Sequence, residues 1–277
     1  MDSLSRPDLK PNSSLSTGEM KALQREIAAA ATFSDEGVID PASLSARGIV
    51  DVGQAGDAAE DDPSGGSADG GRPLVAGVDQ SFVPEDETAI SAIVVVTPTG
   101  DGRFETVERV HAITDLEIPY VPGLLAFREG GPILEAVSRL SVEPDLYLFD
   151  GSGRIHFREA GIATHVGVLL DAPSVGVAKR LLCGEPTEST AGLDRGERVP
   201  IVADDRVETE TGTLLGYAVQ TKQFDSPNRH VNPLYVSPGH RVSAETAAAL
   251  VLACVDGYKL PEPVRMADAY AAEKKRE

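Results

Sequence analysis

Two aspartates of this 277-residue chain stand at the ends of apolar segments, where a β-sheet leads into its loops. Asp79 ends LVAGVD and Asp150 ends DLYLFD, and two glycines, Gly151 and Gly153, closely follow the second aspartate. Loops at the carboxyl ends of strands are where the active sites of open α/β sheets form. One such aspartate is more often a turn residue. Two in matching positions favour a site, and the glycines let a ligand approach the backbone.

A third carboxylate and a lysine extend this pattern. Glu129 lies at the start of a predicted helix after PYVPGLLAFR, where the helix dipole would also accommodate an ordinary N-terminal acid. Asp79, Glu129 and Asp150 offer only oxygen donors, a set that suits Mg²⁺, with Mn²⁺ as a substitute. An ion held in this way activates water and stabilises charge on phosphate oxygens, which is the chemistry of phosphodiester hydrolysis. Lys179, at the end of SVGVAK, either holds a phosphate oxygen or the attacking water, or is a plain surface lysine.

The elements that would position these residues follow from the pattern of apolar side chains. β-Branched residues dominate the segments 74–79, 90–97 and 104–113, which predict an antiparallel meander. Downstream, the predicted helices are 129–140, 160–170 and 244–258, and the predicted extended segments are 146–150, 174–179, 213–220 and 233–237. This order predicts an α/β fold, a mixed β-sheet of an antiparallel meander plus parallel strands, with helices on both faces.

The catalytic domain is placed at residues 73–262, with three further segments around it. Within residues 1–32, Ser16 and Glu19 have the spacing of a capping box and begin a helix that should pack on the domain. Residues 33–72 are rich in Gly, Ser and Asp, which predicts a flexible acidic insertion that cleavage does not require. Residues 263–277 are interpreted as a charged C-terminal tail.

The net charge of −19 argues at first against a nucleic-acid partner, because phosphates attract lysine and arginine. The balance of 25 basic against 44 acidic residues, however, is typical of proteins kept soluble in concentrated salt. In molar salt the Debye length is about 3 Å, so only charges in contact with the partner matter. The composition therefore predicts a halophilic source, a halophilic archaeon, and does not exclude DNA or RNA.

Two function classes are disfavoured by what the sequence lacks. No apolar segment approaches the length of a membrane span, and the first residues do not resemble a signal peptide, so we expect a cytoplasmic protein with no membrane partner. Cys183 and Cys254 lack the spacing of metal ligands, which excludes a thiolate metal site. One domain of this size is expected to act as a monomer.

Five motifs, in one order along the chain, resemble those of the endonuclease V family. They are Ala76-Gly77-Val78-Asp79; Pro119-Tyr120-Val121-Pro122-Gly123 leading to Phe127-Arg128-Glu129; Asp150-Gly-Ser-Gly153 with His156, Gly161, Ala163, His165 and Gly167; PSVGVAK at 173–179; and Ser237-Pro-Gly-His240-Arg241. The resemblance covers roughly residues 17 to 32 and 73 to 258. It departs from the family where His156-Phe157-Arg158-Glu159 stands in place of His-Pro-Arg.

The resemblance implies an RNase H-like fold and a role for each matched residue. The implied catalytic residues are Asp79, Glu129 and Asp150, which would gather the metal, with Lys179 and His240 beside it. The implied wedge, which enters the nucleic acid at the lesion, is Tyr120 with Pro119, Val121 and Pro122. The implied pocket for the damaged base comprises Gly123, Leu125, Gly151 and His156. A tyrosine ring there would replace stacking worth about 1 to 3 kcal/mol per base.

The activity implied by the resemblance is DNA repair. Such an enzyme recognises deoxyinosine, whose base is deaminated adenine, and hydrolyses the second phosphodiester bond 3′ to the lesion with Mg²⁺, leaving the lesion in place. One alternative is an inosine-specific endoribonuclease, because the contacts that would sense the 2′-hydroxyl cannot be placed from sequence. A non-catalytic binder of deaminated bases is a more distant alternative, since it has no need of three carboxylates.

Overall fold

A single nine-stranded sheet, with the order β3-β2-β1-β4-β5-β9-β8-β7-β6, runs through the part of the chain that the computed structural model describes. That part comprises residues 4–44, 71–83, 87–99, 101–119, 121–224 and 230–277. The strands are β1 (Val75–Val83), β2 (Thr88–Pro98), β3 (Phe104–Asp115), β4 (Leu146–Phe149), β5 (Ser174–Ala178), β6 (Glu185–Pro186), β7 (Arg198–Val202), β8 (Leu214–Val219) and β9 (Leu234–His240). The sheet is mixed: β1, β4 and β5 are parallel and the other pairings are antiparallel.

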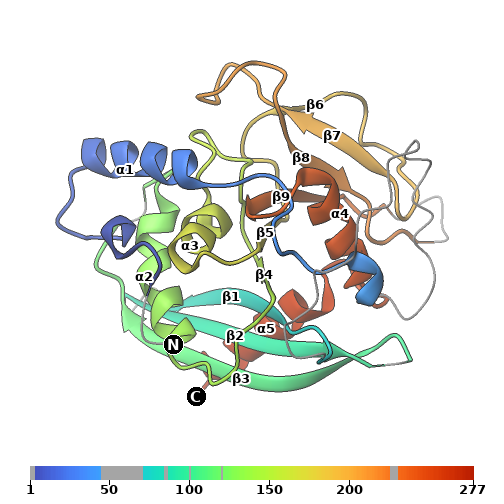
Figure 1. Cartoon of the computed structure of the whole chain (residues 1–277), viewed down its shortest axis with the longest axis horizontal. Helices are drawn as coiled ribbons and strands as arrows, with labels where there is room; N and C mark the ends of the chain where they lie inside the picture. Colours follow the sequence, from blue (N-terminus) through green and yellow to red (C-terminus); the bar gives the residue numbers. More distant parts are fainter. Residues whose placement is uncertain (1–3, 45–70, 84–86, 100, 120, 225–229) are drawn as a thin grey trace.

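The two faces of the sheet are both apolar and both covered by helices (Figure 1). In β4, Leu146 and Leu148 join one core cluster, whereas Tyr147 and Phe149 join the other, as the period of two in a strand requires. The first cluster lies under α4 (Ala244–Ala253) and α5 (Glu262–Lys274), and the second under α2 (Leu125–Val137) and α3 (Ile162–Leu170). The predicted mixed sheet with helices on both faces is confirmed.

The N-terminal helix α1 (Thr17–Ala30) begins where the capping box predicts. Ser16 Oγ accepts a hydrogen bond from the backbone N–H of Glu19, and the Glu19 carboxylate accepts one from the N–H of Ser16 at 2.8 Å. Met20 and Ile27 are buried, and α1 packs against α3 in the layer that covers one face of the sheet (Figure 1). The expected packing of this helix on the domain is thus observed.

Residues 33–44 were expected to belong to a flexible insertion, and for these residues the expectation is wrong. Ile39 and Leu44 are buried in the core cluster that α4 covers. Asp35 accepts hydrogen bonds from the backbone N–H of Ser243, at 2.7 Å, and from the hydroxyl of Thr246, so it caps the start of α4. Few but well-placed apolar residues hold this segment, while residues 45–70 lie outside the described part of the chain.

The interpretation of residues 263–277 as a charged tail is also wrong, because α5 packs across β1 and β2. Val264, Ala267 and Ala271 are buried, and their spacing of three and four places them on one helix face. The helix begins directly over Gly77, where a Cβ atom would lie only 2.0 Å from the carbonyl oxygen of Pro263. Small residues on both elements permit this close approach.

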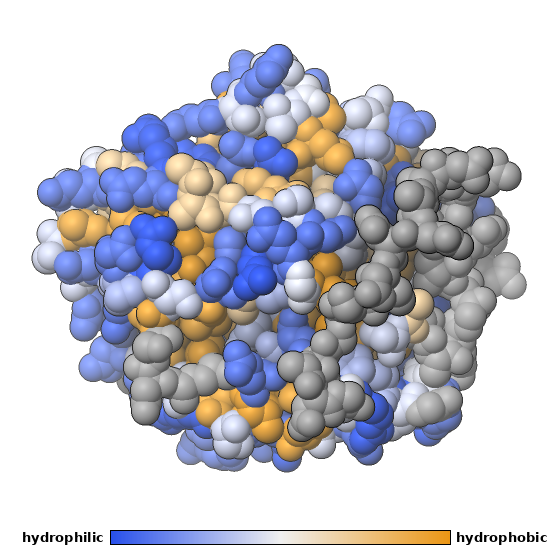
Figure 2. Space-filling model, in the orientation of Figure 1, coloured by the Kyte–Doolittle hydropathy of each residue, from blue (hydrophilic) through white to orange (hydrophobic). Residues whose placement is uncertain are grey.

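The outer surface is mostly hydrophilic, with apolar patches between polar regions on the face that Figure 2 shows. None of the described helices is long and apolar enough to cross a membrane.

Candidate active site

Asp79 and Asp150 lie side by side on neighbouring parallel strands. Val78 of β1 pairs with Phe149 of β4, so the next residue on each chain, Asp79 and Asp150, falls at the same level. The alternation of side chains directs both carboxylates to the face of the sheet that α5 covers. The backbone N–H of Asp150 donates to the carbonyl of Val78 at 2.9 Å, which fixes the level of the two residues.

Asp268 on α5 completes a cluster of three carboxylates with these two aspartates, which we call the acidic cluster. One carboxylate oxygen from each of Asp79, Asp150 and Asp268 lies within 4.8 Å of the other two. Asp79 and Asp150 are partly buried, whereas Asp268 is exposed. The sequence prediction missed Asp268, although the buried Val264, Ala267 and Ala271 around it have helical spacing and signalled a packed helix.

The acidic cluster fits a divalent cation of the Mg²⁺ type. Its donors are all carboxylate oxygens, which Mg²⁺ and Mn²⁺ prefer. Two metal–oxygen bonds of roughly 2.1 Å join oxygens up to about 4.2 Å apart, so small side-chain rotations bring all three onto one ion. Phosphate and water oxygens would complete the coordination of an ion held by so few protein ligands.

Like charges gathered in a partly buried place alter the acidity of this cluster. Burial, and then the charge of Asp150, raise the pKa of Asp79 to about 8. Lys179, which follows β5, donates a hydrogen bond from Nζ to Asp150 Oδ2 at 2.6 Å. Partial burial opposes the ammonium charge, but the bond to Asp150 raises the pKa of Lys179 overall. The structure therefore places Lys179 beside the carboxylates, as expected.

Glu129 lies near the acidic cluster without belonging to it. It shares the lining of a small cavity of about 70 Å³ with Asp79 and Asp150, but it is not one of the three carboxylates that meet within 4.8 Å. Burial raises the pKa of Glu129 to about 7. Its predicted position at a helix start is wrong, because α2 begins at Leu125 and Glu129 lies on the second turn. A helix dipole therefore does not explain this acid.

His240 does not lie beside the acidic cluster, contrary to the expectation. It is the last residue of β9 and pairs with Ser174, the first residue of β5, whereas Asp150 follows the end of the parallel strand β4. Its Nδ1 accepts the backbone N–H of Thr32 at 3.1 Å, so the proton resides on Nε2, which contacts Asp171 at 3.1 Å. These bonds join the chain after α1 to the loop between α3 and β5.

The rest of the SPGHR motif supports the loop that carries Asp150. The backbone N–H of Gly153 donates to Ser237 Oγ at 3.0 Å, and that of Arg154 donates to the carbonyl of Pro238 at 2.8 Å. A Cβ atom at Gly153 would lie 2.2 Å from that carbonyl, so only glycine fits there. The motif thus acts on the site through the backbone.

The residues expected to form the wedge and the base pocket follow β3 and lead into α2. Pro119 and Pro122 are exposed and Val121 is partly buried, while Tyr120 lies outside the described residues. Gly123 is buried with a φ of +76°, and Leu125 is partly buried. Gly151 packs against Ile162. His156 is buried, and burial lowers the pKa of its imidazole to about 4, so the ring is neutral at neutral pH. The structure brings Gly123 and His156 together through Arg158.

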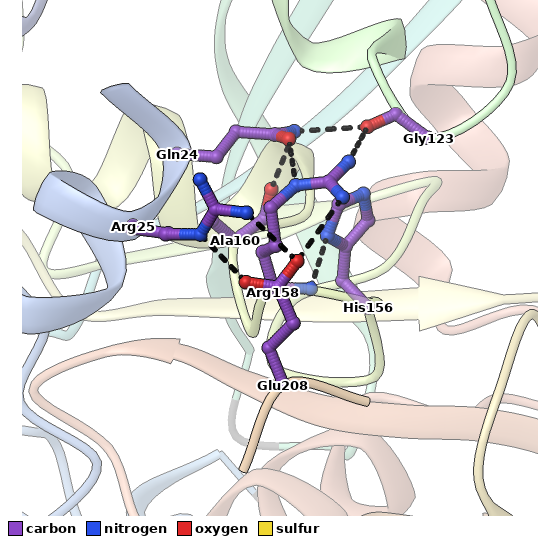
Figure 3. A network of polar contacts seen from close by, with 7 residues as sticks. All are labelled: Gln24, Arg25, Gly123, His156, Arg158, Ala160 and Glu208. Atoms are coloured by element: carbon purple, nitrogen blue, oxygen red, sulfur yellow. Dashed lines mark hydrogen bonds and ion pairs between the residues drawn. The ribbon is translucent and has the colours of Figure 1, made fainter. Parts of the chain in front are cut away.

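Arg158 lies at the centre of a polar network (Figure 3). We call this network the Arg158 clasp, and its members are Gln24, Arg25, Gly123, Arg158 and Glu208. The Arg158 guanidinium donates to the side-chain oxygen of Gln24 at 2.6 Å and to the carbonyl of Gly123 at 3.1 Å. The Gln24 amide also donates to that carbonyl, at 3.1 Å. Glu208 lies 3.7 Å from Arg158 and accepts two hydrogen bonds from Arg25. The clasp therefore ties α1 and two loops to the residue that follows the proposed wedge.

The departure at Phe157 and Glu159 is accommodated within the same loop. The Phe157 ring would be 3.2 Å from a Cβ at Gly123. The backbone carbonyl of Phe157 accepts a hydrogen bond from the N–H of Glu208 at 2.8 Å. Glu159 has a φ of +51° and pairs with Arg154 at 2.7 Å. The added acid thus has a basic partner, and Phe157 supplies packing where a proline would supply rigidity.

The fold is that of the RNase H-like class, and carboxylates from two neighbouring parallel strands and a helix meet on its mixed sheet as a possible metal site of a nuclease. A model of the endonuclease V family matches residues 65–269. The endonuclease V of Haloarcula marismortui is 55% identical over 275 residues, which cover 98% of this chain and 96% of that protein. The chain belongs to the endonuclease V family.

Two solved structures are similar over nearly the whole chain. The crystal structure of the endonuclease V of Streptomyces avermitilis is 28% identical with a TM-score of 0.73, covering 97% of each chain. That of Ciona intestinalis, in complex with a 24mer DNA containing an inosine followed by a ribo-adenosine, is 25% identical with a TM-score of 0.67, covering 94% of this chain and 97% of that one. Three relatives of 50 to 55% identity come from halophilic archaea, as the acidic composition predicts.

Proposed function

We propose that this nuclease recognises deoxyinosine in DNA and hydrolyses the second phosphodiester bond 3′ to it, leaving the damaged base in the strand. The observation that carries the proposal is the acidic cluster, in which oxygens of Asp79, Asp150 and Asp268 lie within 4.8 Å of one another. Membership of the endonuclease V family, and a relative bound to DNA that contains inosine, support the choice of substrate.

The chain's own residues would divide the chemistry among them. Asp79, Asp150 and Asp268 would hold a Mg²⁺ ion, which would supply a Lewis acid for the phosphate and would make a water more acidic. Lys179, already bonded to Asp150, holds a phosphate oxygen or orients the attacking water. Glu129 lines the small cavity next to Asp79 and Asp150, where its carboxyl can accept a hydrogen bond from water that enters beside the ion.

Recognition of the lesion would fall to the segment between β3 and α2. We propose that Tyr120 enters the stack with Pro119, Val121 and Pro122 around it, and that Gly123, Leu125, Gly151 and His156 surround the extruded base. Hypoxanthine lacks the 2-amino group of guanine, so a close wall of glycine backbone would exclude guanine by contact. The Arg158 clasp supports this assignment because it holds Gly123 and His156 beside each other.

An inosine-specific ribonuclease is the second candidate, because the Ciona intestinalis relative binds a strand with a ribo-adenosine after its inosine. The decisive experiment compares nicking of matched DNA and RNA strands, each with one inosine, at equal enzyme concentration and with Mg²⁺. We expect a nick at the second bond 3′ to deoxyinosine in DNA and a lower rate on RNA. Preferential cleavage of RNA would favour the second candidate, and equal inactivity of wild-type enzyme on both would contradict the proposal. Asp79→Asn serves as the inactive control.

The wedge assignment has a separate test, because a tyrosine ring can stack on bases but is a poor metal ligand. Tyr120→Ala should weaken binding to inosine strands by roughly 5- to 150-fold, the equivalent of about 1 to 3 kcal/mol of stacking. The loss should be smaller for mismatched or single-stranded inosine, where the base is already poorly stacked. Binding is measured with Ca²⁺ in place of Mg²⁺ to suppress cleavage. Unchanged affinity on every substrate would remove Tyr120 from this role.

A further inference from the structure

A pocket of about 480 Å³ opens next to the acidic cluster, on the side of β5 that faces β9. Its walls are the end of β5, the segment 190–193 and the segments on either side of residues 225–229. Lys179 lines this pocket and also bonds to Asp150, so one residue joins the pocket to the acidic cluster. Of the wedge and base-pocket residues that the structure describes, none contributes to its lining.

The described lining of this pocket is opposite in charge to the protein as a whole. Its described lining contains Lys179, Arg180 and His230 but no aspartate or glutamate, in a chain with 44 acidic and 25 basic residues. A second cavity of comparable size, about 430 Å³ beside α2, carries both Glu135 and Glu143. The described lining is therefore locally basic, and an anion can bind to it despite the overall charge.

Among the described residues of the lining, Arg180 is the arginine that remains available for a ligand. It is exposed, and it forms no ion pair or side-chain hydrogen bond with any residue that the structure describes, whereas the Lys179 ammonium is engaged by Asp150. His230 and Asn232 are also exposed on the pocket wall. A planar guanidinium beside an amide and an imidazole is a suitable donor set for phosphate oxygens.

The walls around these donors are fixed by buried or partly buried amides. Gln220 donates from Nε2 to the carbonyls of Lys222 and Val231, each at 2.7 Å. Gln223 accepts the backbone N–H of Val231 at 3.3 Å and donates to the carbonyl of Leu193 at 3.4 Å. The two glutamines thus tie the opposite walls of the pocket together, so part of the ordering cost is met before a ligand arrives.

We propose that this pocket binds a phosphodiester of the strand that is cut, one that flanks the cleaved bond, with Arg180 as the principal contact. The inference rests on the proposed nuclease function, because a strand whose phosphate occupies the acidic cluster can continue past Lys179 into the pocket. The ligand is the sugar–phosphate backbone, so the contact adds affinity and sets the position of the strand without reading its sequence.

The test is a scan of single neutral linkages on an inosine-containing DNA strand, with one methylphosphonate at each position on both sides of the lesion. Binding is measured for wild type, for Arg180→Ala and for the control Arg103→Ala, with Ca²⁺ in place of Mg²⁺. Arg103 is exposed in the turn between β2 and β3. We expect Arg180→Ala to weaken binding about 10-fold and to reduce the slope of log affinity against log salt by about 1, with no change in the control.

A methylphosphonate at one particular position should weaken binding by wild type but should not weaken binding by Arg180→Ala any further. The reason is that the phosphate charge removed there and the arginine removed in the variant form one contact. The inference is overturned if Arg180→Ala binds as tightly as wild type, or if it responds to every methylphosphonate as wild type does. Absence of cleavage at inosine by wild type would instead refute the proposed function. The same scan on an undamaged single strand would then still show whether Arg180 contacts one phosphate.

Discussion

In the acidic cluster three carboxylates of like charge face one another, whereas in the Arg158 clasp each charged group has an opposite partner or a carbonyl. Asp79 is partly buried beside Asp150, and its raised pKa shows that the metal-free protein resists a full set of charges there. Arg158 is buried, with a side chain only 9% exposed, yet Gln24, Gly123 and Glu208 satisfy it.

The difference indicates what each region is for. Lys179 pairs with Asp150, but one ammonium does not balance three carboxylates that lie close together. Their remaining repulsion destabilises the folded state, so such an arrangement is useful only if a cation joins it. A satisfied buried arginine, by contrast, fixes the relative positions of the segments it bonds. The acidic cluster is therefore expected to respond to mutation in activity, and the Arg158 clasp in stability and substrate binding.

The largest effect should come from neutralising the acidic cluster. Asp150→Asn or Asp268→Asn removes a charged ligand, and we expect the cleavage rate with Mg²⁺ to fall at least about 1000-fold, the equivalent of about 4 kcal/mol of barrier. Circular dichroism should show that both variants remain folded. Near-normal cleavage by Asp268→Asn would remove that residue from the site and leave Asp79 and Asp150 as the remaining members.

The next effect should come from breaking the Arg158 clasp. Arg158→Met leaves the Gly123 carbonyl and the Gln24 side chain with fewer donors, and we expect the free energy of unfolding to fall by about 2 to 3 kcal/mol. Denaturant unfolding in high salt measures this. Affinity for an inosine strand should also fall while Ca²⁺ binding is unchanged. If Arg158→Met lost only stability, the clasp would have no part in positioning the Gly123 segment.

A smaller effect, of opposite sign, should follow when the like-charge repulsion is relieved. The pKa of Asp79 is raised to about 8 in the folded protein, so the folded state keeps this proton at pH values where the unfolded chain has lost it. Without a metal ion, the free energy of unfolding of the wild-type protein should therefore fall as the pH rises from about 4 to about 8. Asp79→Asn should therefore be more stable than wild type by about 1 to 3 kcal/mol at pH 8 without divalent ions, and nearly equal at pH 4. Thermal unfolding with a chelator measures the difference, and added Mg²⁺ should reverse it. A variant that is less stable than wild type at pH 8 would contradict this reasoning.

The smallest effect should come from the exposed side of the Arg158 clasp. Arg25 and Glu208 form a two-bond ion pair with side chains 54% and 42% exposed. Water screens such a pair, so Arg25→Met should lower the free energy of unfolding much less than Arg158→Met does. The comparison with Arg158→Met in the same assay separates burial from charge. Equal losses in the two variants would show that Arg25 is as important to the clasp as Arg158.

The sequence was most informative where a local pattern decides a structure. The apolar runs before Asp79 and Asp150 predict two strands that end in carboxylates, and the spacing of Ser16 and Glu19 predicts the start of α1. Each of these inferences needs only neighbouring residues, because alternation and capping are local properties of the backbone. The motifs of the endonuclease V family added the order of the segments and the expectation of a shared site.

The sequence was least informative where distant segments meet. Nothing next to Asp268 in MADAYAAEKKRE marks it as a ligand; it joins the acidic cluster because α5 packs against Gly77 and the small residues of that helix permit the approach. His240 was expected beside the metal because the resemblance to the endonuclease V family implies it, yet the antiparallel pairing of β9 with β5 places it beside Ser174.

The sequence by itself thus determined that carboxylates end two strands of a mixed sheet, and that their donors suit Mg²⁺. Only the tertiary structure decided that Asp268 completes the acidic cluster, that His240 binds Thr32 and Asp171, and that Arg158 holds Gly123. The physical reason is the range over which each interaction acts along the chain. Backbone periodicity fixes which way a side chain points within one element, but the packing of one element on another fixes which side chains meet.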